Sequence, residues 1–289
     1  MKYLIVNADD YGMCKSANLA VQELFELGYL KSATLEVPCP AAKEAAEYAA
    51  AHPEFAVGVH LTLTSEWPHY AWEPLTDGTS LRNEKGFMWQ NSKQVEQNAR
   101  WTDIEPELQA QLDQARAWGL HPSHLDNHMG SLYGIETGRL ALAKNTLKFC
   151  SRNNLPYRLY TRRSEVIRHP DMKPWQYQAY SRIAAHWVRK YRVITPDYLY
   201  LPQWTEEMRQ SYEVYRENIL NQWCNLPEGI TETYLHPSLD TEEIRHITGR
   251  WQDRVWEYQL MKDPETHRRL KDAGVKLISY RDLVTMKKG

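Results

Sequence analysis

The sequence lacks paired cysteines, long apolar runs and an excess of charge of one sign. Its four cysteines are scattered without a Cys-x-x-Cys pair, so we expect reduced thiols in a cytoplasmic protein. No stretch approaches the roughly 20 apolar residues that cross a bilayer, and the amino-terminal apolar run is too short for a signal-peptide core. With 35 basic and 37 acidic residues, the chain offers no electrostatic reason to bind nucleic acid. We therefore expect neither a membrane nor a nucleic-acid partner.

Phenylalanine is also scarce, whereas the aromatic residues with a polar group are abundant. The chain has 4 Phe, 11 Trp and 18 Tyr. Such rings stack on the apolar faces of sugars, and they are equally useful at interfaces. No Gly-rich loop follows the first expected strand, which argues against an open nucleotide-binding sheet.

Short apolar runs alternate with segments of helical period, which is typical of parallel strands joined by helices. The pattern predicts strands near residues 3–8, 33–37, 57–63, 123–126, 157–160, 198–201, 232–236 and 275–279. Between them it predicts helices near 15–27, 41–51, 104–118, 140–150, 175–191, 206–223 and 242–261. We expect one α/β domain over 1–289, a deformed (β/α) TIM-like barrel with seven or eight strands. Residues 161–227 would form an aromatic-rich helical elaboration.

In such barrels the chemistry lies at the carboxyl ends of the strands. Residues 7–12 read Asn-Ala-Asp-Asp-Tyr-Gly and end the first strand. Neighbouring side chains on a strand point to opposite faces, so Asp9 and Asp10 share a site only if the chain turns, and Tyr11-Gly12 offers that turn. The alternative is that Asp10 caps the following helix.

Histidines end three further expected strands. His60 alternates with apolar residues and would point into the barrel, although a lone His there is often only structural. His124, Asp126 and His128 follow at the fourth strand, and His236 precedes Pro237 at a late strand. An Asp with two neutral imidazoles makes a three-ligand site with open positions, which is the catalytic pattern for a metal. A second Asp and a further His could then serve as base and acid.

The same four segments together resemble the YdjC-type carbohydrate deacetylases, which include chitooligosaccharide deacetylases. The motifs lie at residues 7–12, 58–63, 124–128 and 235–237 and so span most of the chain. The resemblance implies a deformed barrel that hydrolyses an N-acetyl group with one divalent ion.

The resemblance also implies a role for each residue. Asp10, His60 and His128 would hold the metal, Asp9 would be the general base and His236 the general acid. Apart from the resemblance, we expect His124 and Asp126 to lie behind the ligands or to pack structurally. One departure concerns the run after the fourth strand, which reads His128-Met129-Gly130 where many relatives carry several histidines.

The expected substrate is a small acetylated amino sugar or short chitooligosaccharide. Histidine ligation favours Zn²⁺, while the resemblance keeps Mg²⁺ as an alternative. Rival hypotheses are a metallohydrolase of another amide, an ester or a phosphate, a metal-free glycosidase using Asp9 with a distant carboxylate, and a non-catalytic sugar-binding protein. A homodimer through the aromatic segment is one further option.

Two expectations concern the loops. Residues 66–100 form a long connection that should cover the carboxyl end of the barrel, because long connections are usually functional. Four tryptophans are candidates for a sugar-stacking wall, or alternatively anchor this connection on the barrel: Trp67, Trp72, Trp89 and Trp204.

Overall fold

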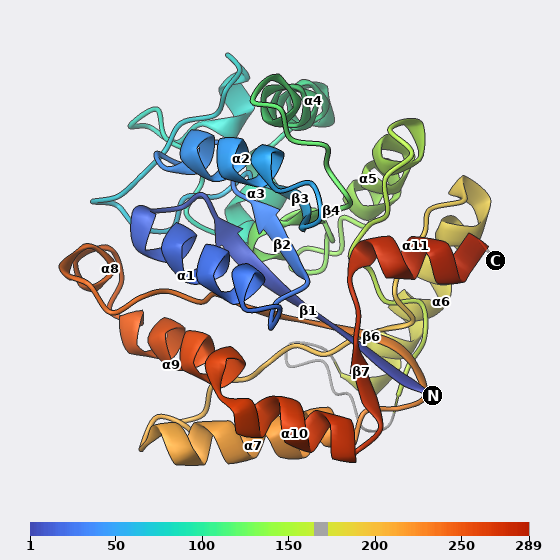
Figure 1. The fold of residues 1–289 in the computed structure, drawn as a ribbon. Coiled ribbons are helices and arrows are strands. Elements are labelled where there is room, and N and C mark those ends of the chain that lie inside the picture. Colours follow the sequence, from blue (N-terminus) through green and yellow to red (C-terminus); the bar gives the residue numbers. More distant parts are fainter. Residues whose placement is uncertain (165–172, 289) are drawn as a thin grey trace.

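A curled parallel sheet of seven strands forms the centre of the computed structural model, which describes residues 1–164 and 173–288 (Figure 1). The strands follow the order β4-β3-β2-β1-β6-β5, and β7 also pairs with β1. Their bounds are Lys2–Tyr11 (β1), Ser32–Leu35 (β2), Ala56–Leu61 (β3), Leu125–Asn127 (β4), Tyr198–Leu199 (β5), Gly229–Leu235 (β6) and Val275–Leu277 (β7). The predicted α/β barrel class and strand number are therefore confirmed.

Strand β1 organises the sheet because it is long and almost entirely buried. Its residues Lys2 to Ala8 pair with β6. On the opposite side, β7 pairs with its first residues and β2 with its last, from Asn7 to Tyr11. A strand with neighbours at both edges and packing on both faces has a near-continuous run of apolar residues in its sequence. This run is why β1 was predictable from the sequence.

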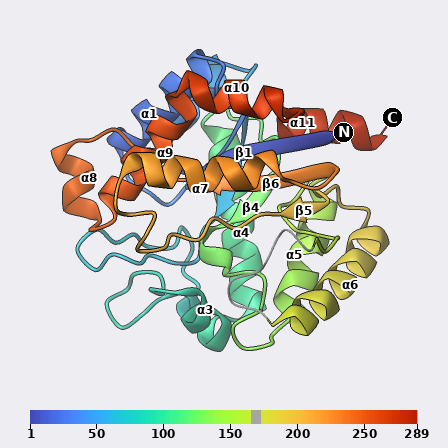
Figure 2. The same cartoon turned by 90° about the horizontal axis from the view of Figure 1, so that it is seen from below.

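Helices cover the outside of the sheet. In Figure 1, α2 lies above β1, α1 lies between β1 and α9, and α7 and α10 lie below them. Figure 2 places α10 and α11 at one end of the view and the segment that carries α3 at the opposite end. The bounds are Lys15–Glu26 (α1), Ala42–Ala51 (α2), Ser92–Asn98 (α3), Trp101–Ala117 (α4), Ala141–Arg152 (α5), Pro174–Tyr191 (α6), Tyr212–Cys224 (α7), Glu242–Ile247 (α8), Trp251–Lys262 (α9), Pro264–Asp272 (α10) and Tyr280–Lys288 (α11).

The strand predicted over 157–160 is wrong, because this segment forms only an isolated bridge from Tyr157 to Leu125 of β4. Its backbone bonds are divided between two neighbours. Arg158 N–H donates to the carbonyl of Leu125, whereas Tyr157 N–H donates to that of Ile194. The segment therefore spans the gap between β4 and the chain leading to β5 without becoming a regular strand.

The single helix predicted over 242–261 is also wrong, because α8 and α9 are separate. Thr248 between them is extended, at φ −137° and ψ 137°. Its hydroxyl accepts a hydrogen bond from Arg250 N–H, which turns the chain before α9 begins.

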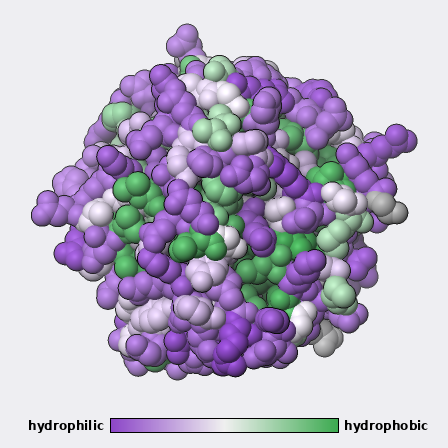
Figure 3. Space-filling model, in the orientation of Figure 1, coloured by the Kyte–Doolittle hydropathy of each residue, from purple (hydrophilic) through white to green (hydrophobic). Residues whose placement is uncertain are grey.

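The aromatic segment 161–227 contains α6, β5 and α7, and residues 165–172 of it lie outside the described residues. Its role as an elaboration of one domain over 1–289 stays a prediction. No helix in the described ranges is both long and apolar enough to span a membrane. Hydrophilic residues cover most of the face in Figure 3, with hydrophobic ones gathered in patches between them.

Candidate metal centre and active site

A β-bulge brings Asp9 and Asp10 to one site. The pairing register between β1 and β2 shifts between Ala8 and Tyr11, and Asp10 adopts a left-handed backbone conformation with φ 58°. Asp tolerates this conformation better than most residues. The predicted turn at Tyr11-Gly12 follows directly, closed by the Met13 N–H donating to the carbonyl of Asp10. The helix-cap alternative does not apply, because Cys14 is the N-cap of α1 and Asp10 bonds to Arg254 instead.

The carboxyl ends of the strands surround a cavity of about 360 Å³, within the usual range for small-ligand sites. All five predicted site residues line it: Asp9, Asp10, His60, His128 and His236. The long connection contributes Glu66, Ser92 and Glu96, in agreement with its predicted position.

Three of these side chains offer a compact donor set. Asp10 Oδ1 lies 3.6 Å from His60 Nε2 and 4.0 Å from His128 Nε2. Donors bound tetrahedrally to Zn²⁺ at about 2.1 Å lie about 3.4 Å apart, so these two distances are close to those of such a site. Asp10 Oδ1 is buried and has no hydrogen-bond partner in the described chain, as expected of an oxygen meant for a cation. These residues therefore fit a divalent ion.

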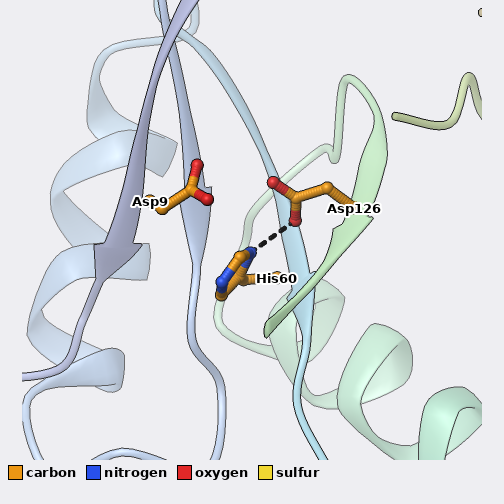
Figure 4. Close-up of side chains that lie close together, drawn as sticks. All are labelled: Asp9, His60 and Asp126. Atoms are coloured by element: carbon orange, nitrogen blue, oxygen red, sulfur yellow. Dashed lines mark hydrogen bonds and ion pairs between the residues drawn. The ribbon is translucent and has the colours of Figure 1, made fainter. Parts of the chain in front are cut away.

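Each histidine has a partner that fixes its ring. His60 Nδ1 contacts Asp126 Oδ1 (Figure 4) at 2.6 Å, and His128 Nδ1 lies 2.7 Å from Thr64 Oγ1. A proton on Nδ1 leaves Nε2 free as a ligand atom. Asp126 thus lies behind His60 as predicted. His124 stacks on Tyr280 at 3.6 Å between ring centroids and bonds to Asn7, which is the structural packing expected as the alternative.

Two sets of acidic and histidine side chains lie close enough to share an ion. The first comprises Asp9, His60 and Asp126. In that set both carboxylates already contact the Arg158 guanidinium, which leaves little reason for a second cation. The second set comprises Asp10, Glu36 and His128.

Arg158 holds Asp9 in a bidentate ion pair. Its Nη1 and Nη2 lie 2.6 Å from Asp9 Oδ2 and Oδ1, and its Nε lies 2.8 Å from Glu232 Oε1. Although burial works to raise the pKa of Asp9, Arg158 holds it below its usual value. Asp9 is therefore ionised at neutral pH.

Asp10 has a comparable partner in Arg254, whose Nη2 lies 2.7 Å from its Oδ2. Burial opposes ionisation of Asp10, but Arg254 and the neighbouring histidines hold its pKa well below the usual range. Burial likewise disfavours the charged form of His128, yet the Glu36 and Glu66 carboxylates raise its pKa to about 10. Protons and metal therefore compete for this ring.

His236 lies at the tip of β6, where Glu257 of α9 anchors it. Glu257 Oε2 accepts a hydrogen bond from the His236 backbone N–H at 2.6 Å and lies 3.6 Å from its Nδ1. Burial lowers the pKa of His236, but Asp10 and Glu257 raise it above the usual value overall. The ring therefore holds its proton more readily than a free imidazole does, and it lines the cavity.

The four tryptophans anchor loops rather than line the cavity. Trp72 donates to Thr64 O, Trp67 packs edge-on against Trp72, Trp89 donates to Ser80 O, and Trp204 stacks on Tyr215. Tyr133 and Tyr234 are the tyrosines among the described lining residues. The alternative interpretation of the tryptophans, loop anchoring, is the one the structure supports.

Sequence reasoning missed Arg158, Arg254 and Glu36. Glu36 directly follows β2 and so met the same strand-end criterion as the residues that were chosen. Arg158 is a charged residue inside an aromatic run, which was a usable signal. Arg254 lies on a helix of mixed polarity, and nothing in the sequence distinguishes it from an exposed arginine.

Comparison with known proteins gives this site its family. The family model described as YdjC-like protein matches residues 3–272, so the chain belongs to the YdjC-like family. A carbohydrate deacetylase from Geobacillus stearothermophilus is 29% identical over 97% of this chain and 98% of its own. A chitooligosaccharide deacetylase from Yersinia enterocolitica is 36% identical over 44% of this chain and 49% of its own. The predicted family and enzyme class, a carbohydrate deacetylase, are thereby confirmed.

A solved structure supports the fold. It comes from Enterococcus faecalis V583 and is described as that of a candidate cellobiose-phosphate cleavage protein. It is 26% identical, covers 98% of both chains and has a TM-score of 0.74. The deformed barrel is therefore shared over the whole length.

Proposed function

We propose that this protein hydrolyses the N-acetyl group of an acetylated amino sugar or short chitooligosaccharide and releases acetate. The observation that carries the proposal is the position of Asp10 Oδ1. It is buried and unpartnered within 4.0 Å of the Nε2 atoms of His60 and His128, in the cavity that Asp9 and His236 also line. The names of the relatives supply the substrate class, and the cavity size suits one or two sugar units.

Asp10, His60 and His128 would hold one divalent ion. When bound, such an ion supplies Lewis-acid activation of water and of the acetamide carbonyl. One carboxylate and two imidazoles favour Zn²⁺, and Mg²⁺ is the alternative. The same divalent charge would also displace the proton that His128, with its pKa of about 10, otherwise holds.

Asp9 is proposed as the general base. Its Oδ1 accepts from both Arg158 and Asn7, whereas Oδ2 accepts only from Arg158 among the described residues. Because a carboxylate oxygen has two lone pairs, Oδ2 retains one that can accept a proton from the attacking water. Arg158 fixes the plane of the carboxylate and keeps it charged.

His236 is proposed as the general acid. An amine leaves poorly without a proton, and Asp10 and Glu257 favour the protonated form of His236 by raising its pKa. Glu257 aims the ring from α9 through the backbone of His236. Base and acid thus come from the ends of two adjacent strands, β1 and β6.

The test is acetate release from N,N′-diacetylchitobiose by protein supplied with Zn²⁺ or Mg²⁺. A phosphate ester, a simple acetate ester and an unacetylated chitooligosaccharide serve as comparison substrates. Acetate release that EDTA abolishes supports the proposal. Turnover of the phosphate ester alone supports another metallohydrolase, EDTA-resistant cleavage of the sugar chain supports the glycosidase hypothesis, and binding without turnover supports a lectin-like role. Homodimerisation and a cytoplasmic location also stay predictions.

A further inference from the structure

A second carboxylate lies beside the predicted metal ligands and has no role so far. Glu36 follows β2 and is fully buried. Its Oε1 lies 3.5 Å from His128 Nδ1. No N–H or O–H group of the described residues donates to either carboxylate oxygen, and the neighbouring Cys39 thiol is a weak donor.

Such a group needs a compensating partner. Buried carboxylates that lack hydrogen bonds cost several kcal/mol, and proteins normally pair them or place them on a metal. Three buried oxygens here have no donor, Asp10 Oδ1 and both oxygens of Glu36, and one carboxylate oxygen of each residue lies within 4.8 Å of the other. One cation between them would satisfy all three.

The distances allow one ion to be shared. One ligand atom each from Asp10, Glu36 and His128 lie within 4.8 Å of one another. Ligands on opposite sides of an octahedral ion with bonds of about 2.1 Å lie about 4.2 Å apart. Asp10 and His128 are also the residues that lie near His60 in the proposed metal site. Glu36 would therefore join that site through two side chains that it already contains.

We propose that Glu36 is a further ligand of the ion that Asp10, His60 and His128 hold. The inference rests on the metal site of the proposed function and adds a fourth protein donor to it. Two carboxylates balance the charge of a divalent ion, and the additional oxygen favours coordination numbers above four. Glu36 then sets which ions the site accepts, alongside its effect on affinity.

The experiment measures binding of Zn²⁺ and Co²⁺ at pH 8 by competition with a chromophoric chelator. Glu36→Gln keeps the shape of the side chain and removes its charge. It should weaken the affinity for both ions at least about tenfold, because even the loss of an indirect contact to a metal typically costs this much affinity. Glu36→Asp keeps the charge and should recover part of the affinity. The visible absorption of bound Co²⁺ should change in Glu36→Gln, since its intensity reports coordination number.

Glu66→Gln tests the rival fourth ligand, because Glu66 Oε1 lies 3.6 Å from His128 Nε2 and its Oε2 is also buried without a partner, although its side chain is 22% exposed. It should stay within about threefold of wild type and leave the Co²⁺ spectrum unchanged. The proposal is overturned if Glu36→Gln binds both ions within threefold of wild type, or if Glu66→Gln loses as much affinity. Wild-type protein that binds metal but releases no acetate overturns the proposed function alone, whereas wild-type protein that binds no ion overturns both.

Discussion

Replacing Arg158 with Met should be among the most damaging single changes to this fold. The guanidinium is buried and lies 2.6 Å from Asp9, 2.9 Å from Asp126 and 2.8 Å from Glu232. Methionine fills similar volume but leaves three buried carboxylates without their cation. Removing one partner of a buried ion pair typically costs about 3–5 kcal/mol.

The three pairs belong to one network, so their energies do not add. Burial already raises the pKa of Glu232 to about 7, although Arg158 lowers it, and without Arg158 the carboxylates can relieve the strain by taking up protons. We therefore expect Arg158→Met to lower the free energy of unfolding by about 3–5 kcal/mol at pH 8. The deficit should be smaller near pH 5, where protonation replaces the lost cation.

The assay is urea unfolding of metal-free protein followed by tryptophan fluorescence, at pH 8 and pH 5. Arg162→Met is the control, because Arg162 is 60% exposed and lies 3.6 Å from Asp197. It should change stability by less than about 1 kcal/mol. If Arg158→Met lies within 1 kcal/mol of wild type at pH 8, the three carboxylates do not depend on this arginine and the electrostatic account of Asp9 is wrong.

Three further predictions concern single positions. A Cβ on Gly58 would lie 2.5 Å from the carbonyl oxygen of His124, so Gly58→Ala should push β3 and β4 apart and cost about 1–3 kcal/mol in thermal or urea unfolding; an unchanged midpoint would mean that the strands separate freely. His236→Gln should retain its metal yet lose about 10²- to 10⁴-fold in kcat, measured as acetate release, and a near-normal kcat would assign the acid elsewhere. The folded-state pKa of His128, about 10, exceeds its unfolded value near 6.5, so its contribution to stability is complete below about pH 6.5 and is lost as pH rises toward 10. Metal-free wild type should therefore lose stability over that window, and a loss of equal slope in His128→Gln would refute the assignment.

The sequence predicted the sheet and most of the site because both follow from local patterns. Buried parallel strands such as β1 and β3 appear as apolar runs, and their ends mark where catalytic side chains collect. Asp9, Asp10, His60, His128 and His236 were found in this way, and the structure brings all five to one cavity.

The remainder depends on long-range contacts that no local pattern encodes. Arg158 lies 74 residues from Glu232 and 149 from Asp9, and its segment forms an isolated bridge because its bonds are shared between distant neighbours. Arg254 reaches Asp10 across 244 residues. The end of α8 at Thr248 depends on one hydroxyl group. The starts of α10 at Asp263-Pro264 and of α3 at Asn91 do carry ordinary capping signals, from which these two helices were predictable.

The most direct test of the central claim compares Asp9→Asn with Asp10→Asn, two equal changes at neighbouring residues. Metal content by elemental analysis and acetate release from N,N′-diacetylchitobiose are measured on both variants and on wild type. If Asp9 is the base and Asp10 a ligand, Asp9→Asn keeps its metal and loses about 10²- to 10⁴-fold in kcat. Asp10→Asn instead loses metal and recovers part of its activity when metal is added in excess. The opposite pattern would exchange the two roles, and two variants that both keep metal and activity would contradict the account.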